Sequence, residues 1–206
     1  MAKSKSNAPK NIIVLFVVAF VSVAILAIVN QITMAPIAKA EAEARQASYM
    51  KVFDGADEIT DIADLDSKLT EYAAFVQDPT VKINAVLEAK KGGEKLGYVI
   101  DATSPNGYGG DVQIAIGITN EGEIKAFTVI SASSETPGLG AKSTEPEFQE
   151  QFSGLSALNP IAFSKTGADR GKNEIDAISG ATITTTAVTN TVNEAIGFFN
   201  NILKGE

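Results

Sequence analysis

The chain begins with a continuous hydrophobic run that is unlike anything after it. Ile12 to Val29 reads IIVLFVVAFVSVAILAIV, and Ser22 is its only polar member. A helix rises 1.5 Å per residue, so this run covers most of the ~30 Å hydrocarbon layer of a membrane. Asparagine and glutamine residues mark its polar edges. We therefore predict a transmembrane helix over residues 11–32, preceded by a short N-terminus of residues 1–10.

A cleaved signal peptide is the alternative, because it also combines a basic start with an apolar core. Its core is usually shorter and ends in a small-x-small site, of which Ala38 and Ala40 offer only an imperfect example. Length therefore favours an uncleaved anchor. Three lysines lie in the first ten residues, and no acidic residue precedes Glu41. The positive-inside rule then predicts a cytoplasmic N-terminus and an extracytoplasmic domain, in a single-pass protein of the cell membrane.

The residues after the span lose this continuous hydrophobicity. Residues 35–53 are rich in alanine with interspersed charges, which favours a helix that extends from the anchor as a stalk. Residues 54–79 are acidic, and the stretch SKLTEYAAFV within them is typical of a short helix. We expect residues 33–79 to form this stalk and a helical region.

Strand-like patterns begin near residue 80. Four segments alternate or run apolar over strand length, and stretches with turn residues separate them, which implies an antiparallel sheet. A short helix is expected at 144–152, with Pro146 near its start. Helices at both ends of a meandering sheet give an α+β fold for a domain of residues 80–206. The four predicted strands are 81–89, 95–103, 112–119 and 124–133.

The last predicted helix runs to about residue 203 and has one apolar face. That face is expected to pack on the sheet. Its residues are Val188, Val192, Ala195, Ile196, Phe199 and Leu203.

Composition restricts the chemistry available to this domain. The chain has no cysteine and no histidine, which excludes disulfides, thiolate nucleophiles, histidine bases and metal sites built on these ligands. Any redox or group-transfer role would therefore need a bound cofactor. The formal net charge is −8, and the lysines at the N-terminus leave the domain more acidic still. Nucleic-acid binding needs basic surfaces, so we expect no nucleic-acid partner.

Two stretches of the domain carry unusual turn sequences. GYGG at 107–110 is explained by a flexible hairpin connection at least as well as by a loop whose backbone amides approach a flat or anionic ligand. SSETPGLGAK at 133–142 can turn sharply at its proline and glycines. Its Leu139 needs cover, either from the core or from a flat aromatic ring. Lys142 could place a positive charge near a developing anion.

A third stretch, DAISGATITTT at 176–186, lies immediately before the last helix. Helix N-termini bind phosphate through unsatisfied amides and the helix dipole, so this position favours a phosphate-bearing ligand. The glycine and alanine at 180–181 permit close backbone approach, and no lysine follows to make a nucleotide P-loop. The alternative without a ligand is that the serine and threonines serve as N-caps.

DAISGAT resembles the flavinylation motif of the FMN-binding domains of the Rnf complex and the sodium-pumping NADH:quinone reductase. In those families the last threonine of the motif carries FMN as a phosphodiester, and that position is Thr182 here. ETPGLGAK resembles the second signature of these families, a loop that lines the isoalloxazine ring. The order of span, domain and motif also matches. A length of about 200 residues suits the G-type flavoprotein of the Rnf complex better than its longer C-type counterpart in the quinone reductase.

This resemblance implies a set of cofactor-binding residues. Thr182 would be a modification site for covalent FMN, so neither a catalytic residue nor a metal ligand is expected. The motif contributes Asp176, Ser179, Gly180, Ala181 and Thr182, and Thr184 and Thr185 after it could be partners of the phosphate oxygens. The second loop contributes Glu135, Thr136, Pro137, Gly138, Leu139, Gly140 and Lys142. Tyr108 of the GYGG stretch is added as a further candidate for cofactor binding.

The resemblance also implies a function and partners. The chain would be the membrane-anchored electron-transfer component of a ferredoxin:NAD oxidoreductase that couples electron flow to sodium or proton translocation. Its partners would be the other membrane and peripheral subunits, including a second flavinylated membrane subunit. An Mg-dependent flavin transferase would use FAD to attach FMN and release AMP. The alternatives are the C-type flavoprotein of the quinone reductase, a single-pass sensor that binds a ligand non-covalently, and a structural anchor.

Overall fold

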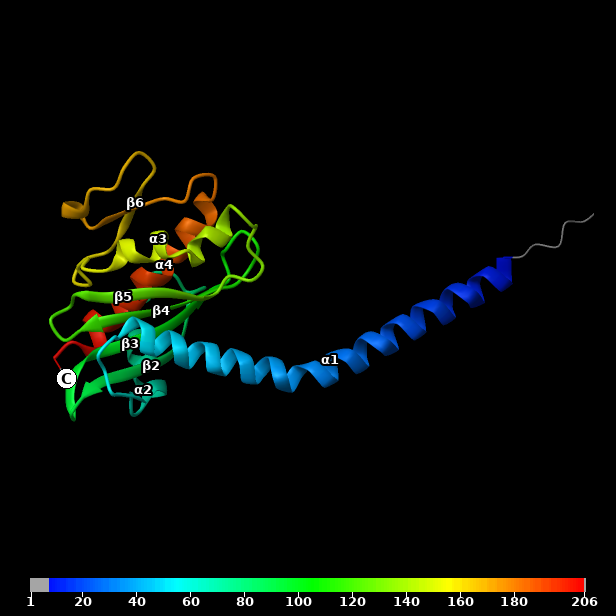
Figure 1. Ribbon diagram of the computed structural model, residues 1–206, viewed down its shortest axis with the longest axis horizontal. Coiled ribbons are helices and arrows are strands. Elements are labelled where there is room, and N and C mark those ends of the chain that lie inside the picture. Colours follow the sequence, from blue (N-terminus) through cyan, green and yellow to red (C-terminus); the bar gives the residue numbers. More distant parts are fainter. Residues whose placement is uncertain (1–7, 206) are drawn as a thin grey trace, which may run out of the picture. The chain divides into compact units, whose positions relative to one another are not determined.

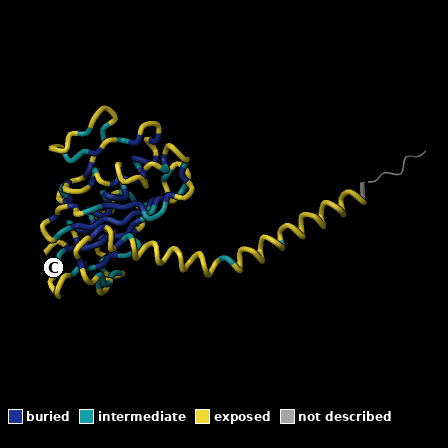
Figure 2. The backbone as a smooth tube through the Cα atoms, viewed as in Figure 1, coloured by how far each residue is buried: buried dark blue, intermediate teal, exposed yellow. Residues whose placement is uncertain are grey.

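The computed structural model describes residues 8–205, and its first element is one long helix, α1 (Ala8–Val52). Within the described chain, α1 is long and apolar enough to cross a membrane, judged by length and composition. Its large apolar residues are exposed along the expected span, and Figure 2 colours nearly all of this segment as exposed. The hydrocarbon of a bilayer is the environment that matches such a surface. The predicted span and the predicted stalk are thus parts of a single helix.

The chain divides into two compact units after Ala44. The first unit contains only helix among its described residues. The second begins at Arg45, so it includes the last two turns of α1 together with every strand. The domain therefore contains the end of the stalk.

Five antiparallel strands form the main sheet, and they follow one another in chain order from β1 to β5. Figure 1 labels β2 to β5 of this sheet. Four of them coincide with the predicted strands to within a few residues. The edge strand β1 was not predicted, and it lies in the region where only helical pieces were expected. The bounds are β1 (Glu58–Asp61), β2 (Lys82–Lys91), β3 (Glu94–Ser104), β4 (Val112–Thr119) and β5 (Ile124–Ser131).

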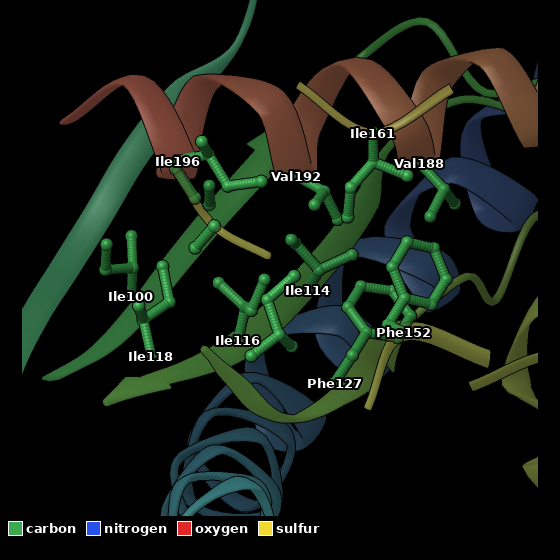
Figure 3. Close-up of a cluster of buried hydrophobic side chains, with 14 of the residues drawn as sticks. Ile100, Ile114, Ile116, Ile118, Phe127, Phe152, Ile161, Val188, Val192 and Ile196 are labelled. Carbon is green, nitrogen blue, oxygen red and sulfur yellow. The ribbon is translucent and has the colours of Figure 1, made fainter. Parts of the chain in front are cut away.

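One face of this sheet is covered by the C-terminal helix α4 (Thr182–Phe198), which continues as the π-helix η4 (Phe199–Leu203). Alternate residues of the central strands point at α4, for example Ile114, Ile116 and Ile118 of β4. They meet Val188, Val192 and Ile196 of the helix (Figure 3). The predicted apolar face of the last helix is confirmed, since all six of its residues are buried.

The other face is covered by the end of α1 and the residue after it. Val52 and Phe53 pack against Val99 and Ala115, whose neighbours in each strand point the opposite way. A Cβ on Gly117 of β4 would collide with the carbonyl of Val52, so the helix end lies directly on the sheet. Both faces of the sheet are therefore buried, which explains why the strand segments read as nearly continuous apolar runs.

Short elements connect and extend this core. The helix expected at 144–152 is a short α-helix followed by a turn of 3-10 helix, and Pro146 begins it as predicted. The parallel pair β6–β7 was not predicted, and it positions Asp176 at the start of the flavinylation-like motif. The remaining bounds are α2 (Leu65–Tyr72), η1 (Gly140–Thr144), α3 (Pro146–Gln149), η2 (Glu150–Phe152), β6 (Ala162–Ser164), η3 (Arg170–Lys172) and β7 (Glu174–Asp176).

Candidate functional site

A cavity of about 400 Å³ lies where three chain segments meet. This volume falls within the range of roughly 300–1,000 Å³ that is typical of small-molecule sites. The segments are the turn between β3 and β4, the loop after β5, and the start of α4. All three were identified from the sequence. The lining residues are Tyr108, Glu135, Thr136, Leu139, Gly140, Gly180, Ala181, Thr182, Ile183 and Thr184.

The loop after β5 folds tightly before it reaches the cavity. Gly138 has a φ of +75°, which a residue with a side chain rarely adopts. The amides of Leu139 and Ala141 both donate to the carbonyl of Thr136, and the chain then enters η1. This geometry leaves Leu139 43% exposed at the cavity, so the leucine is not covered by the core.

The start of α4 presents backbone amides to the same cavity. Gly180 has a φ of +77° and turns the chain into the helix. The N-cap residue is Ala181, and no side chain of the described residues caps this end. The amide of Ala181 donates to Ile178, whereas those of residues 182–184 have no partner in the preceding turn, as expected for a helix N-terminus. These amides and the helix dipole favour an anion at this position.

The hydroxyl groups around this helix start differ in their environment. Thr184 donates to a side chain of the loop, and Thr185 donates to the carbonyl of Ala181 while accepting from the amide of Ile178. Thr186 donates to the carbonyl of Thr182. Thr185 therefore stabilises the turn, and its fully buried hydroxyl does not line the cavity.

Thr182 differs from these neighbours. Its side chain is exposed, it lines the cavity, and its hydroxyl has no hydrogen-bond partner among the residues that the structure describes. Ser179 is exposed as well, but it lies outside the main cavity.

A second cavity of about 350 Å³ is lined by three other predicted site residues. These residues are Lys142, Asp176 and Ser179. The other lining residues are Glu145, Glu147, Phe148, Gln151, Ala177 and Ile178. Asp176 also shapes its own loop, because its carboxylate accepts from the amide of Ala168 and its amide donates to Gln151. The structure thus separates these three residues from the cavity that Thr182 lines. Pro137 and Gly138 belong to the loop but line neither cavity.

Ile183 was not predicted as a site residue. This side chain is 54% exposed and lines the main cavity, as do Tyr108, which is 69% exposed, and Leu139. A large apolar residue between two threonines at a helix start was the signal for it. Three apolar side chains from three segments therefore surround one polar helix end. A ligand with a flat apolar part and an anionic part would be complementary to this arrangement.

Comparison with known families matches two parts of the chain. The FMN-binding domain family matches residues 107–197, which include all three cavity segments. The RnfG N-terminal region matches residues 1–52, which correspond to α1 and the residues before it.

Two curated relatives match nearly the whole chain and a third matches about half of it, and each is the G component of its complex. That of the Na(+)-translocating ferredoxin:NAD(+) oxidoreductase complex of Acetobacterium woodii is 32% identical over 93% of this chain and 91% of the relative. That of the ion-translocating oxidoreductase complex of Shewanella piezotolerans is 30% identical over 95% and 91%. That of the proton-translocating ferredoxin:NAD(+) oxidoreductase complex of Clostridium ljungdahlii is 37% identical over 52% and 56%.

Two solved structures share the fold. NqrC of Shewanella oneidensis superimposes with a TM-score of 0.59 at 16% identity, over 80% of this chain and 96% of that one. The C component of the Na(+)-translocating NADH-quinone reductase of Parabacteroides distasonis gives 0.58 at 17% identity, over 84% and 98%. The α+β arrangement expected from the sequence is confirmed by these folds.

Proposed function

The chain belongs to the RnfG family, the G components of Rnf-type ion-translocating oxidoreductase complexes, and from this premise we propose that it carries FMN covalently on Thr182. Membership of this family with an FMN-binding domain makes FMN the cofactor and makes other subunits of the complex its partners. The N-terminal apolar helix fits a membrane-anchored protein.

The proposal rests on the Thr182 hydroxyl, which has no hydrogen-bond partner among the residues that the structure describes. Thr184, Thr185 and Thr186 all use their hydroxyls in hydrogen bonds, whereas Thr182 is exposed at the cavity and at the helix N-terminus. A phosphodiester on that oxygen would lie next to the amides of residues 182–184, which have no partner in the described part of the chain, and next to the positive end of the dipole. This charge complementarity supports phosphate attachment at Thr182.

The apolar side chains around the cavity support a flat ring as the other part of the ligand. Tyr108, Leu139 and Ile183 are exposed at the cavity, and an isoalloxazine ring would cover them. FMN supplies the redox chemistry when bound, and the chain contains no cysteine or histidine that could supply it. The role of these side chains is to bind the ring and to exclude water from its apolar edge.

Attachment is assigned to a separate Mg-dependent flavin transferase that uses FAD. In that step the Thr182 oxygen would form a bond to the phosphorus of the FMN half, and the bond between this phosphorus and the oxygen bridging to AMP would break. AMP leaves, and the hydroxyl proton is transferred to a base of the transferase. The flavin is neither oxidised nor reduced in this transfer.

The wider role follows from the relatives. We propose that the chain passes electrons within a ferredoxin:NAD oxidoreductase that couples this flow to sodium or proton translocation. One relative is named as sodium-translocating and another as proton-translocating. A second flavinylated membrane subunit is an expected partner. The lysines before the span support a cytoplasmic N-terminus and a domain on the extracytoplasmic side of the membrane.

Intact mass tests the attachment. Full-length protein made with the transferase should exceed the mass of the polypeptide by one FMN minus one water, and protein made without it should be colourless. Thr182→Ala should remove the added mass. Thr182→Ser is the matched control, because it keeps a hydroxyl and should still be loaded at least in part. Added flavin mass that persists in Thr182→Ala would contradict the assignment. Reversible flavin binding without any added mass would favour the non-covalent sensor instead.

A further inference from the structure

The carboxylate of Glu135 lies at the junction of the three segments that form the main cavity. Glu135 is only 6% exposed. One of its oxygens, Oε2, accepts a hydrogen bond of 2.9 Å from the hydroxyl of Thr184 in α4. The other, Oε1, accepts one of 3.4 Å from the amide of Gly109 in the turn between β3 and β4. One side chain therefore joins its own loop to the other two walls.

Glycines surround this carboxylate closely. A Cβ on Gly140 would collide with Glu135 Oε2 and with the Thr184 hydroxyl, and a Cβ on Gly107 would lie 2.7 Å from Glu135 Oε1. A Cβ on Gly109 would collide with the backbone just before Glu135. These glycines in GYGG and PGLG therefore permit the segments to close around Glu135. Their absence of side chains serves the packing of the cavity walls, whatever ligand the cavity holds.

We propose that Glu135 is a positioning residue that holds the three walls of the FMN cavity in their ligand-ready arrangement before the cofactor arrives. This inference rests on the proposed function, because it names the cavity as the FMN site. Glu135 does so through Thr184, which fixes the first turn of α4, and through Gly109, which fixes the turn that carries Tyr108. Without it, the helix end that faces the phosphate and the side chains that face the ring lose their common support.

The geometry of the two hydrogen bonds predicts that Glu135 acts through the shape of its side chain and not through its negative charge. Both hydrogen bonds need a planar group with two polar atoms at the end of a two-carbon side chain. Glutamine supplies this shape: its Oε1 can accept from the Gly109 amide, and its Nε2 can donate to Thr184, because a hydroxyl both donates and accepts. Glu135→Gln should therefore keep the walls together, whereas Glu135→Ala removes both links.

The experiment compares variants of the full-length protein in detergent after co-expression with the flavin transferase. Intact mass gives the fraction loaded. The visible circular dichroism of the flavin and the quenching of its fluorescence by iodide report how firmly the cavity holds the ring. Glu147→Ala is the matched control, because this exposed carboxylate lines only the neighbouring cavity. The thermal unfolding of unloaded protein shows whether each variant folds.

We expect Glu135→Gln and Glu147→Ala to match the wild type in loading, circular dichroism and quenching. We expect Glu135→Ala either to load poorly while folded, or to load and then lose most of the flavin dichroism with severalfold stronger iodide quenching. Thr184→Val, which removes only the hydroxyl donor, should shift the same readouts in the same direction, and Thr184→Ser should restore them. If Glu135→Ala does not fold, the Thr184 pair decides the test.

Two results would overturn the inference. The first is a loaded Glu135→Ala protein, or a loaded Thr184→Val protein, with wild-type dichroism and quenching. The second is a Glu135→Gln protein as defective as Glu135→Ala, which would make charge the important property. Failure of the wild-type chain to load FMN would instead contradict the proposed function, so the two failures are distinguishable.

Discussion

Tyr49 and Tyr72 each donate a hydrogen bond to a buried carboxylate. The hydroxyl of Tyr49 lies 2.7 Å from Asp101, and that of Tyr72 lies 2.7 Å from Glu194. Burial of the two phenols, and then the bond to the carboxylate, raises the pKa of both tyrosines well above their ordinary value near 10. At the residue scale these two contacts therefore link the stability of the domain to alkaline pH.

The sign of the pH dependence of stability follows from the direction in which the pKa of each tyrosine shifts. A pKa that is higher in the folded state gives stability that is fully present below the unfolded value and is lost as pH rises through the folded value. We expect the free energy of unfolding in urea to fall above about pH 10. The double variant Tyr49→Phe, Tyr72→Phe should show a flatter decline. At neutral pH it should be less stable by about 1–3 kcal/mol for each buried carboxylate left short of a donor.

The control is Tyr108→Phe, in which the altered ring is exposed. It should keep the wild-type decline. Identical slopes above pH 10 in the wild type and the double variant would contradict this account of the two tyrosines.

At the scale of elements, burial on both faces decided which strands could be predicted. The segments of β2 to β5 are long, and their patterns follow directly from packing between α4 and the end of α1. The strand β1 has four residues, half of them exposed, and β6 and β7 have three residues each. Such short segments carry no period of their own. The strand β1 forms because β2 offers it a backbone partner, and β6 and β7 form by pairing with each other.

The candidate site was predictable only where a local sequence pattern marks it. The helix N-terminus and the turn-rich loops were visible as local patterns, and the resemblance singled out Thr182. The link between Glu135, Thr184 and Gly109 joins residues 26 and 49 positions apart in sequence, so no local pattern contains it. Lys142 is near the site in sequence, yet η1 turns it into the neighbouring cavity.

The end of α1 is the element whose role is easiest to test. Tyr49, Val52 and Phe53 bury themselves against the sheet, and the Asp101 that accepts from Tyr49 also accepts from Asn84 and Gln113. Burial of a side chain such as Val52 or Phe53 contributes about 1.5–3 kcal/mol. A chain that begins at Arg45 should unfold thermally at the same temperature as the full-length protein. One that begins at Asp57 should lose several kcal/mol or fail to fold.

This comparison separates the two units of the chain. Both shortened proteins lack the apolar span, so a difference between them reports only residues 45–56. Equal unfolding temperatures would show that the end of α1 is a dispensable linker, contrary to the packing described above.

At the scale of the whole molecule, charge is arranged differently on the two sides of the apolar helix. Lysines precede the span and no acid does, whereas the domain is strongly acidic. A negatively charged domain is not attracted to the anionic cytoplasmic leaflet, whereas the N-terminal lysines are attracted to it. These two asymmetries act in the same direction, so the proposed orientation does not depend on the identity of the partners.

The absence of cysteine allows this orientation to be measured with single introduced thiols. In spheroplasts, a membrane-impermeant maleimide should label Gln46→Cys before lysis and Ser6→Cys only after lysis. Replacing the three N-terminal lysines with glutamine should weaken the positive-inside bias and allow some Ser6→Cys to be labelled before lysis. The opposite labelling in the otherwise unaltered chain would place the flavin domain in the cytoplasm. It would then face soluble electron donors directly, and an extracytoplasmic electron-transfer step would have to be abandoned.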